Sequence, residues 1–90
     1  MTAQTIPVTV RYYAAARAAA GVETETVAVV AGATVTDLVA ELRTRDQQLA
    51  VVLQRCSFLC DGVAVRDLHG TQKPLTTNQT VDVLPPFAGG

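Results

Sequence analysis

The residues best suited to chemistry stand at the end of the sequence. They are Pro85, Pro86, Phe87, Ala88, Gly89 and Gly90. Each proline ring fixes φ at about −65° and removes an N–H donor, which stiffens the exit from the preceding apolar run. The glycines have no Cβ, so we expect the Gly90 carboxylate to end a narrow and flexible segment. Fully extended, these residues reach roughly 20 Å. We therefore expect a folded domain over residues 1–84 and a functional tail over residues 85–90 that can enter a narrow pocket of another protein.

The other reactive side chains form no recognisable catalytic set. Ser57, His69 and the cysteines show no arrangement of nucleophile, base and orienting group. Cys56 and Cys60 are the only cysteines, and no second pair exists to complete a zinc site. On one strand they would lie about 13 Å apart, which is too far for a disulfide. We expect free thiols, no metal site, and a chain that does not catalyse a reaction alone.

Length and charge exclude several classes of protein. Ninety residues make one small domain. Seven basic side chains oppose eight acidic ones and only one lysine is present, so a nucleic-acid binder is not expected. No stretch approaches the roughly 20 apolar residues of a membrane span, and no basic-then-apolar segment follows Met1. We expect a cytoplasmic protein that does not contact membranes.

The first third of the sequence predicts two strands around a short helix. Residues Ile6–Tyr13 alternate between apolar and polar, as in a half-buried strand. The alanine-rich stretch Ala14–Ala20 ends at Gly21 and predicts a short helical turn. Val22–Val30 predicts a second strand whose register stays open, with either a bulge or an exposed first half.

The middle of the sequence predicts the main helix. Thr34 is placed to cap it, with Asp37 three residues on as a short-armed capping box. Apolar residues then recur at helical spacing, at Val35, Leu38, Val39 and Leu42. A second helical piece is expected over Gln47–Gln54.

The last third predicts three strands. Ser57–Asp61 and residues 63–65 flank Asp61-Gly62, a strong two-residue hairpin signal. Residues 66–79 predict a loop, and Thr80–Leu84 the final strand. Together the elements predict an α+β fold with a mixed sheet packed on one main helix.

Strand alternation also predicts an exposed apolar patch. Val81 and Val83 are expected to point inward, with Asp82 and Leu84 pointing away. By the same parity Tyr13 and Leu59 fall on the uncovered face. Large apolar residues gathered on one face beside the tail predict a contact surface for a partner.

The full set of motifs resembles a known family. The matching residues are Tyr12-Tyr13-Ala14, Arg17, Ala20-Gly21, Gly32-x-Thr34-Val35-x-Asp37-Leu38, Asp61-Gly62, Pro74-Leu75, Val81-x-Val83-Leu84 and the tail from Pro85 to Gly90. The chain resembles β-grasp, ubiquitin-like proteins and, more narrowly, the MoaD/ThiS sulfur carriers, among which MoaD is the small subunit of molybdopterin synthase. The resemblance covers essentially the whole chain, and the tail is its most specific part.

The resemblance implies a mechanism. A MoeB-like enzyme would adenylate the Gly90 carboxylate with ATP and Mg²⁺, neither of which the carrier itself keeps bound. A sulfurtransferase or cysteine desulfurase would supply persulfide sulfur and leave a thiocarboxylate. A MoaE-like large subunit would then use that sulfur to build the molybdopterin dithiolene. Tyr13, Arg17, Leu59 and Leu84 are the residues expected to contact these partners.

Three alternatives stay open. The same tail chemistry could serve thiazole synthesis, cysteine synthesis or tRNA thiolation. The chain could instead be a ubiquitin-like modifier joined through Gly90 to lysines of target proteins. It could also be a passive interaction module whose tail is never activated.

Overall fold

The computed structural model describes residues 4–65 and 73–85. The chain folds in the order β1 (Thr5–Tyr12), α1 (Ala14–Ala20), β2 (Thr24–Val30), α2 (Val35–Arg45), α3 (Gln47–Leu53), β3 (Ser57–Cys60), β4 (Val63–Ala64) and β5 (Thr80–Leu84). Within these residues, the longest helix, α2, has 11 residues, and no helix is long and apolar enough to cross a membrane.

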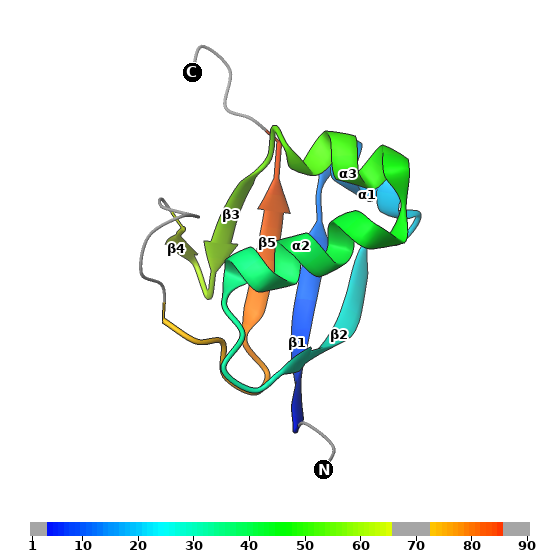
Figure 1. Ribbon diagram of the computed structural model, residues 1–90. Coiled ribbons are helices and arrows are strands. Elements are labelled where there is room, and N and C mark those ends of the chain that lie inside the picture. The colour runs from blue at the N-terminus through cyan, green and yellow to red at the C-terminus, as the bar shows by residue number, and fades with distance from the viewer. Residues whose placement is uncertain (1–3, 66–72, 86–90) are drawn as a thin grey trace.

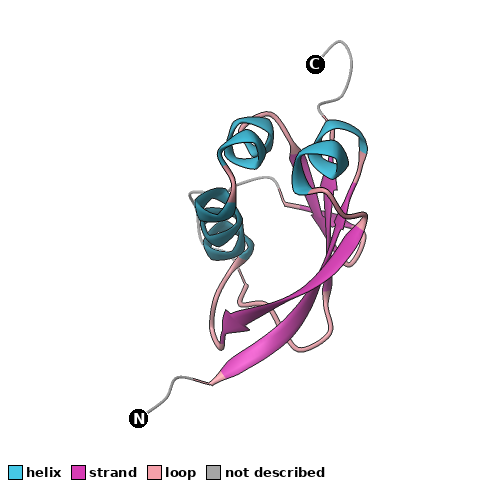
Figure 2. Cartoon of the chain, turned by 90° about the vertical axis from the view of Figure 1, so that its right-hand side faces the viewer, coloured by secondary structure: helices cyan, strands magenta, loops and turns pink. Residues whose placement is uncertain are grey.

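The five strands form one mixed sheet in the order β2-β1-β5-β3-β4. The first and last strands lie side by side in parallel at its centre, and the other pairs are antiparallel. Figure 1 shows β5 between β1 and β3, with α2 crossing in front of the sheet. Figure 2, turned by 90°, shows α2 and α3 on one side of the sheet and α1 at its upper end. The expected α+β fold with a mixed sheet is confirmed, and no helix within residues 4–65 and 73–85 covers the other face of the sheet.

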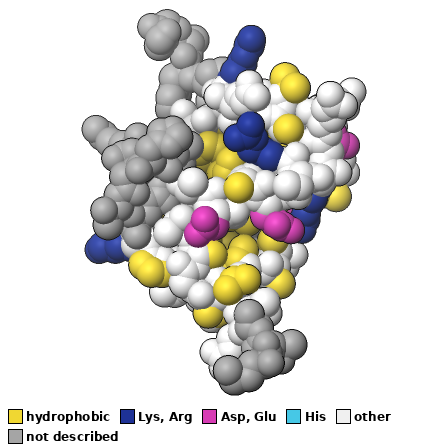
Figure 3. Space-filling model, viewed as in Figure 1, with side chains coloured by type: hydrophobic (Ala, Val, Ile, Leu, Met, Phe, Trp, Pro, Cys, Tyr) yellow, Lys and Arg dark blue, Asp and Glu magenta, His cyan; other side chains and the backbone are white. Residues whose placement is uncertain are grey.

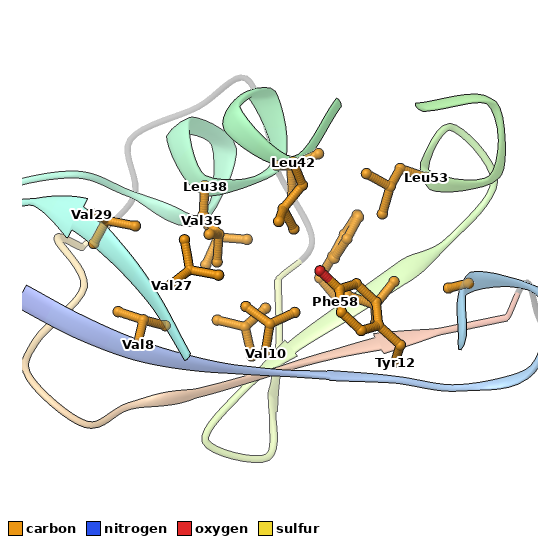
Figure 4. Close-up of a cluster of buried hydrophobic side chains, with 14 of the residues drawn as sticks. Val8, Val10, Tyr12, Val27, Val29, Val35, Leu38, Leu42, Leu53 and Phe58 are labelled. Atoms are coloured by element: carbon orange, nitrogen blue, oxygen red, sulfur yellow. The ribbon is translucent and has the colours of Figure 1, made fainter. Parts of the chain in front are cut away.

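The core lies between α2 and the inner face of the sheet. Leu38 and Leu42 of α2 are fully buried and point toward the valines of β1 and β2 (Figure 4). Phe58 of β3 and Leu53 of α3 extend this core beneath α3. Inward and outward residues alternate along β1, as the sequence predicts.

Local signals in the sequence set the element boundaries. Thr34 accepts a hydrogen bond from the Asp37 backbone N–H, and the Asp37 carboxylate accepts one from the Thr34 N–H, which confirms the predicted capping box. The Asp46 carboxylate accepts bonds from two backbone N–H groups of α3 and so begins that helix. At the hairpin, Asp61 and Gly62 have φ of 49° and 84°, as a two-residue type I′ turn requires.

The second strand decides between the two alternatives that the sequence left open, because its first half is exposed up to Thr26, apart from Glu25. It runs in regular register with β1, without a bulge, and begins at Thr24 rather than Val22. Glu25 faces inward with the valines because two partners satisfy its carboxylate. The Tyr12 hydroxyl donates to it over 2.8 Å, and the Arg45 guanidinium over 2.6 Å. Burial and the hydrogen bond to the Glu25 carboxylate both raise the pKa of Tyr12 above its ordinary value, so the phenol stays a donor.

Other differences are small. β3 ends at Cys60, one residue earlier than expected. Cys56 precedes the strand, as expected, and its thiol donates to the Val52 carbonyl at the end of α3. β4 ends at Ala64, one residue earlier than expected. Much of the expected loop over residues 66–79 lies outside the described residues.

Candidate functional site

The site predicted around the tail begins where β5 ends. β5 lies at the centre of the sheet, and its last residue, Leu84, is followed by the exposed Pro85. The remaining predicted tail residues lie outside the described residues: Pro86, Phe87, Ala88, Gly89 and Gly90. β5 is hydrogen-bonded to β1 on one side and to β3 on the other, which fixes the exit, the point where the chain leaves the sheet.

Two rows of residues that are neighbours across the strands lie on the open face of the sheet, the face without α2, near this exit. In the first row, Arg11 of β1, Asp82 of β5 and Leu59 of β3 are register neighbours. In the second row, Leu84 lies opposite Ser57 of β3. Because Tyr12 pairs with Val83, Tyr13 follows at the level of Leu84 on the β1 side. We call Tyr13, Leu59 and Leu84 the open-face patch, and the pairing places its members on the predicted face, two of them beside the exit.

Tyr13 is held at the point where β1 turns into α1. Its backbone is extended, and its N–H donates to the Val83 carbonyl over 3.2 Å. Ala14 then takes a φ of 54°, which directs the chain away from the sheet into α1. The side chain of Tyr13 remains 36% exposed, whereas Leu59 and Leu84 are half-buried. The patch thus combines fixed backbones with accessible apolar surface.

An ion pair crosses the centre of the open face. The Arg11 guanidinium donates to both carboxylate oxygens of Asp82, over 2.7 and 3.3 Å. Asp82 was expected to point away from the core, and it does, but its side chain is only 11% exposed, and both of its oxygens are bonded to Arg11. The Arg11 guanidinium also lies 5.8 Å from the centre of the Tyr13 ring. The bond to Asp82 raises the pKa of Arg11, so this cation is permanent.

Arg17 contacts a different part of the molecule from the open-face patch. It belongs to α1, is 60% exposed, and its guanidinium is 3.6 Å from the Glu23 carboxylate in the connection to β2. A pair between two exposed side chains contributes little to stability. Its guanidinium is accessible to a partner on the helix side of this end of the molecule.

The cysteines are free, as predicted, and both are half-buried. Burial raises the pKa of the Cys56 thiol. Burial also raises the pKa of Cys60, with a further contribution from the negative charge of Asp61. Both thiols are therefore protonated at neutral pH, and a protonated thiol is a poor nucleophile.

Arg11 and Asp82 were missed as site residues in the sequence. Each has the outward parity of its strand, but 71 positions separate them. Their contact follows only from the parallel pairing of the first and last strands, which local patterns do not predict. His69 falls outside the described residues.

The fold and the exposed face define a class of protein. A mixed sheet whose first and last strands pair in parallel at its centre, with its main helix packed on one face, is the ubiquitin-like β-grasp architecture. Residues 10–90 match the ThiS family, so the match extends through Gly90. The chain belongs to the ThiS family and has the fold of the ThiS/MoaD-type sulfur carriers.

Solved structures agree with this assignment. The HVO 2177 protein of Haloferax volcanii is 29% identical over 96% of this chain and 88% of its own, with a TM-score of 0.82. A Pyrococcus furiosus protein described as molybdopterin converting factor, subunit 1, is 26% identical over 91% of this chain and 99% of its own, with a TM-score of 0.78.

Two further structures share the fold at lower identity. Small archaeal modifier protein 1 of Methanosarcina acetivorans is 24% identical over 97% of this chain and 99% of its own, with a TM-score of 0.77. A complex of subunits 1 and 2 of the molybdopterin-converting factor from Helicobacter pylori contains a chain that is 22% identical over 94% of this chain and 100% of its own, with a TM-score of 0.66. No curated protein matches the sequence.

Proposed function

We propose that this chain is a sulfur carrier that acts as the small subunit of a molybdopterin synthase. The Gly90 carboxylate is its working group, and the β-grasp domain presents that group to partner enzymes. The family match through Gly90 and the fold shared with the Pyrococcus furiosus converting-factor subunit support this function.

The chemistry proceeds in three steps. A carboxylate is a poor electrophile, so a MoeB-like enzyme with ATP and Mg²⁺ first converts it to an acyl adenylate and releases pyrophosphate. The terminal sulfur of a persulfide on a sulfurtransferase or cysteine desulfurase then attacks the acyl carbon and displaces AMP. A second thiol finally cleaves the S–S bond, which leaves the thiocarboxylate on Gly90 and a disulfide on the donor side. Gly89 and Gly90 allow close approach of the partner's groups to the reacting carbon.

The open-face patch supplies the docking surface in this proposal. Tyr13, Leu59 and Leu84 offer apolar area, and the fixed charge of Arg11 at the centre of the face offers orientation. A MoaE-like large subunit is the proposed acceptor. The Helicobacter pylori complex, in which converting-factor subunits 1 and 2 are bound to each other, supports a partner of this kind.

One observation carries the proposal. β5 ends with Leu84 at the level of Tyr13 on the uncovered face, and Pro85 then begins the Pro-Pro-Phe-Ala-Gly-Gly segment. A partner that covers this face is therefore adjacent to Pro85, from which the sequence continues to the reacting carboxylate.

A reconstitution tests the pathway. The thiocarboxylate form can be prepared by cleaving an intein fusion with sulfide, and then mixed with a MoaE-like subunit and cyclic pyranopterin phosphate. We expect formation of the dithiolene product, and none from the ordinary carboxylate form, which serves as the control. Sulfur transfer instead to a thiazole synthase, a cysteine synthase or a tRNA-thiolating enzyme, with none to the pterin, would assign the carrier to another pathway.

A second candidate function is protein modification. The fold shared with small archaeal modifier protein 1 favours it. In that case Gly90 would form isopeptide bonds with lysines of target proteins. Covalent conjugates in a cell extract that disappear when Gly90 is deleted would support this function. Their absence, together with thiocarboxylate formation, would support the carrier alone.

A further inference from the structure

The outer edge of β2 presents unpaired backbone groups. The Tyr12 N–H donates to the Glu23 carbonyl, and the Ala31 N–H to the Gln4 carbonyl, which sets the phase of the β1–β2 ladder. Odd-numbered residues of β2 therefore exchange hydrogen bonds with β1. The even-numbered residues Thr24, Thr26 and Ala28 direct their N–H and C=O groups outward, whereas the Val30 carbonyl already accepts a hydrogen bond from the Ala33 N–H. In the part of the chain that the structure describes, no strand pairs with this edge.

This edge lacks the usual protection against pairing. Edge strands are normally shortened, bulged, or interrupted by proline and lysine. The opposite edge strand, β4, fits that rule with only two residues. β2 has seven residues, no bulge, and the sequence TETVAVV, which contains neither proline nor lysine. Its only charge, Glu25, is already paired with Arg45. β2 is thus a long, regular template for another strand.

A groove runs beside this edge on the helix side. It has a volume of about 540 Å³ and lies between the end of β2 and the start of α2. Val29, Ala31 and Ala33 give it apolar walls, and Asp37 and Glu41 of α2 give it negative charge. Figure 3 shows this face, with acidic side chains bordering a group of hydrophobic ones. A strand added to β2 would turn every second side chain toward this groove.

We propose that the β2 edge and its groove bind an extended peptide segment of a partner protein by strand addition. Backbone groups of the segment pair with Thr24, Thr26 and Ala28. Its groove-facing side chains combine an apolar residue opposite Val27 with lysine or arginine near Asp37 and Glu41. This site lies on the sheet edge away from β3, whose Leu59 belongs to the open-face patch, so it is separate from the proposed carrier function.

The acidic groove selects a basic peptide over a second copy of this chain. Two β2 strands could pair antiparallel about Val27, because their outward groups would be in phase. That dimer would place two copies of α2 on the same side of a continuous sheet. Antiparallel pairing would set the start of β2 of one copy beside the groove of the other, and the charge that it brings there, Glu25, is already paired with Arg45. A basic strand brings unpaired cations to Asp37 and Glu41 and so gains an attraction that β2 of a second copy does not offer.

A symmetric peptide tests the proposal on the full chain. The probe is acetyl-Thr-Lys-Thr-Val-Thr-Lys-Thr-amide, which presents the same groove-facing residues in either strand direction. We expect binding to slow amide hydrogen exchange, measured by NMR, at Thr24, Thr26 and Ala28. Val27 and Val29 should change little, because β1 already protects them. This alternation is specific to strand addition.

Matched probes and variants separate the contribution of backbone hydrogen bonds from that of charge. A peptide with glutamate in place of both lysines, and one with N-methylated threonine amides, should each bind roughly tenfold more weakly or not at all. Ala28→Pro removes an outward N–H without losing a bond to β1 and should weaken binding similarly, whereas Ala28→Val should not. Glu41→Lys should reverse the preference between lysine and glutamate peptides.

Three results would overturn the proposal. The first is no alternating protection with the lysine peptide at concentrations that saturate any shift. The second is equal binding of the N-methylated peptide. The third is a dimer in sedimentation that already protects Thr24, Thr26 and Ala28 without peptide, which would assign the edge to a second copy. Deletion of Gly89 and Gly90 should leave peptide binding unchanged, so these outcomes do not depend on the carrier function.

Discussion

The two faces of the sheet differ in what their side chains do. On the inner face, Val81 and Val83 of β5 are fully buried beneath the helices. On the open face of the same strand, Asp82 is held in an ion pair with Arg11, and Leu84 stays half-buried. The inner face stabilises the fold, and the open face keeps apolar and charged groups accessible. One strand therefore links the stability of the domain to the presentation of the tail.

The largest effect should come from the inner face. Leu38→Ala removes a fully buried side chain and leaves a cavity, so we expect a loss of about 3 kcal/mol in the free energy of unfolding. Leu84→Ala, on the open face, should cost about 1 kcal/mol or less. Urea denaturation of both variants measures the difference. Equal losses would contradict the distinction between the two faces.

A smaller effect should come from the ion pair that crosses the open face. Asp82→Ala removes both acceptors of the Arg11 guanidinium, whose own side chain is 49% exposed. Because Arg11 can turn to water, we expect a loss of roughly 1–2 kcal/mol in unfolding free energy. Asp82→Asn keeps one acceptor and should lose less. If Asp82→Ala were as stable as the parent chain, the ion pair would have no structural role.

Binding and stability should separate at Leu84. Leu84→Asp places a charge in the open-face patch, and we expect affinity for a MoaE-like subunit to fall roughly tenfold or more. The control is Val51→Asp, because Val51 is 58% exposed on α3, on the helix side. Calorimetric titration and a melting curve of each variant test this. A large fall in the melting temperature of Leu84→Asp would show that Leu84 belongs to the core.

The smallest effect concerns the thiols. Because burial raises the pKa of Cys56 and Cys60, less thiolate is present at a given pH than in the unfolded chain. At pH values near the ordinary thiol pKa, of about 8.5, iodoacetamide should alkylate the folded protein more slowly than the chain in urea. The difference should shrink as the pH rises. Equal rates in both states would contradict the burial of these thiols.

Local chemistry made much of the fold predictable. The alternation of residues in the first strand, the Thr34–Asp37 capping box and the Asp61-Gly62 turn each act within a few positions, and each is observed. The same parity placed Leu59 and Leu84 on the open face. These features follow from steric and hydrogen-bonding rules that any homologous or unrelated chain would obey.

Contacts between distant residues were not predictable in the same way. Glu25 faces inward because Tyr12 and Arg45, on two other elements, satisfy its carboxylate. Asp82 is covered because β1 brings Arg11 beside β5. Strand parity alone would make Glu25 an unpaired charge in the core and would leave Asp82 exposed to solvent, and neither is observed. The tail chemistry rests on the residues from Pro86 to Gly90, whose function the sequence pattern and the family match support.

The most direct test of the central claim is the intact mass of the chain after activation. The protein is incubated with a MoeB-like enzyme, ATP, Mg²⁺ and a persulfide donor, with an authentic thiocarboxylate carrier in the same mixture as a positive control. We predict a species in which sulfur replaces one oxygen of the Gly90 carboxylate, and none when Gly90 is deleted. Conversion of the control alone, with the mass of this chain unchanged, would contradict the account.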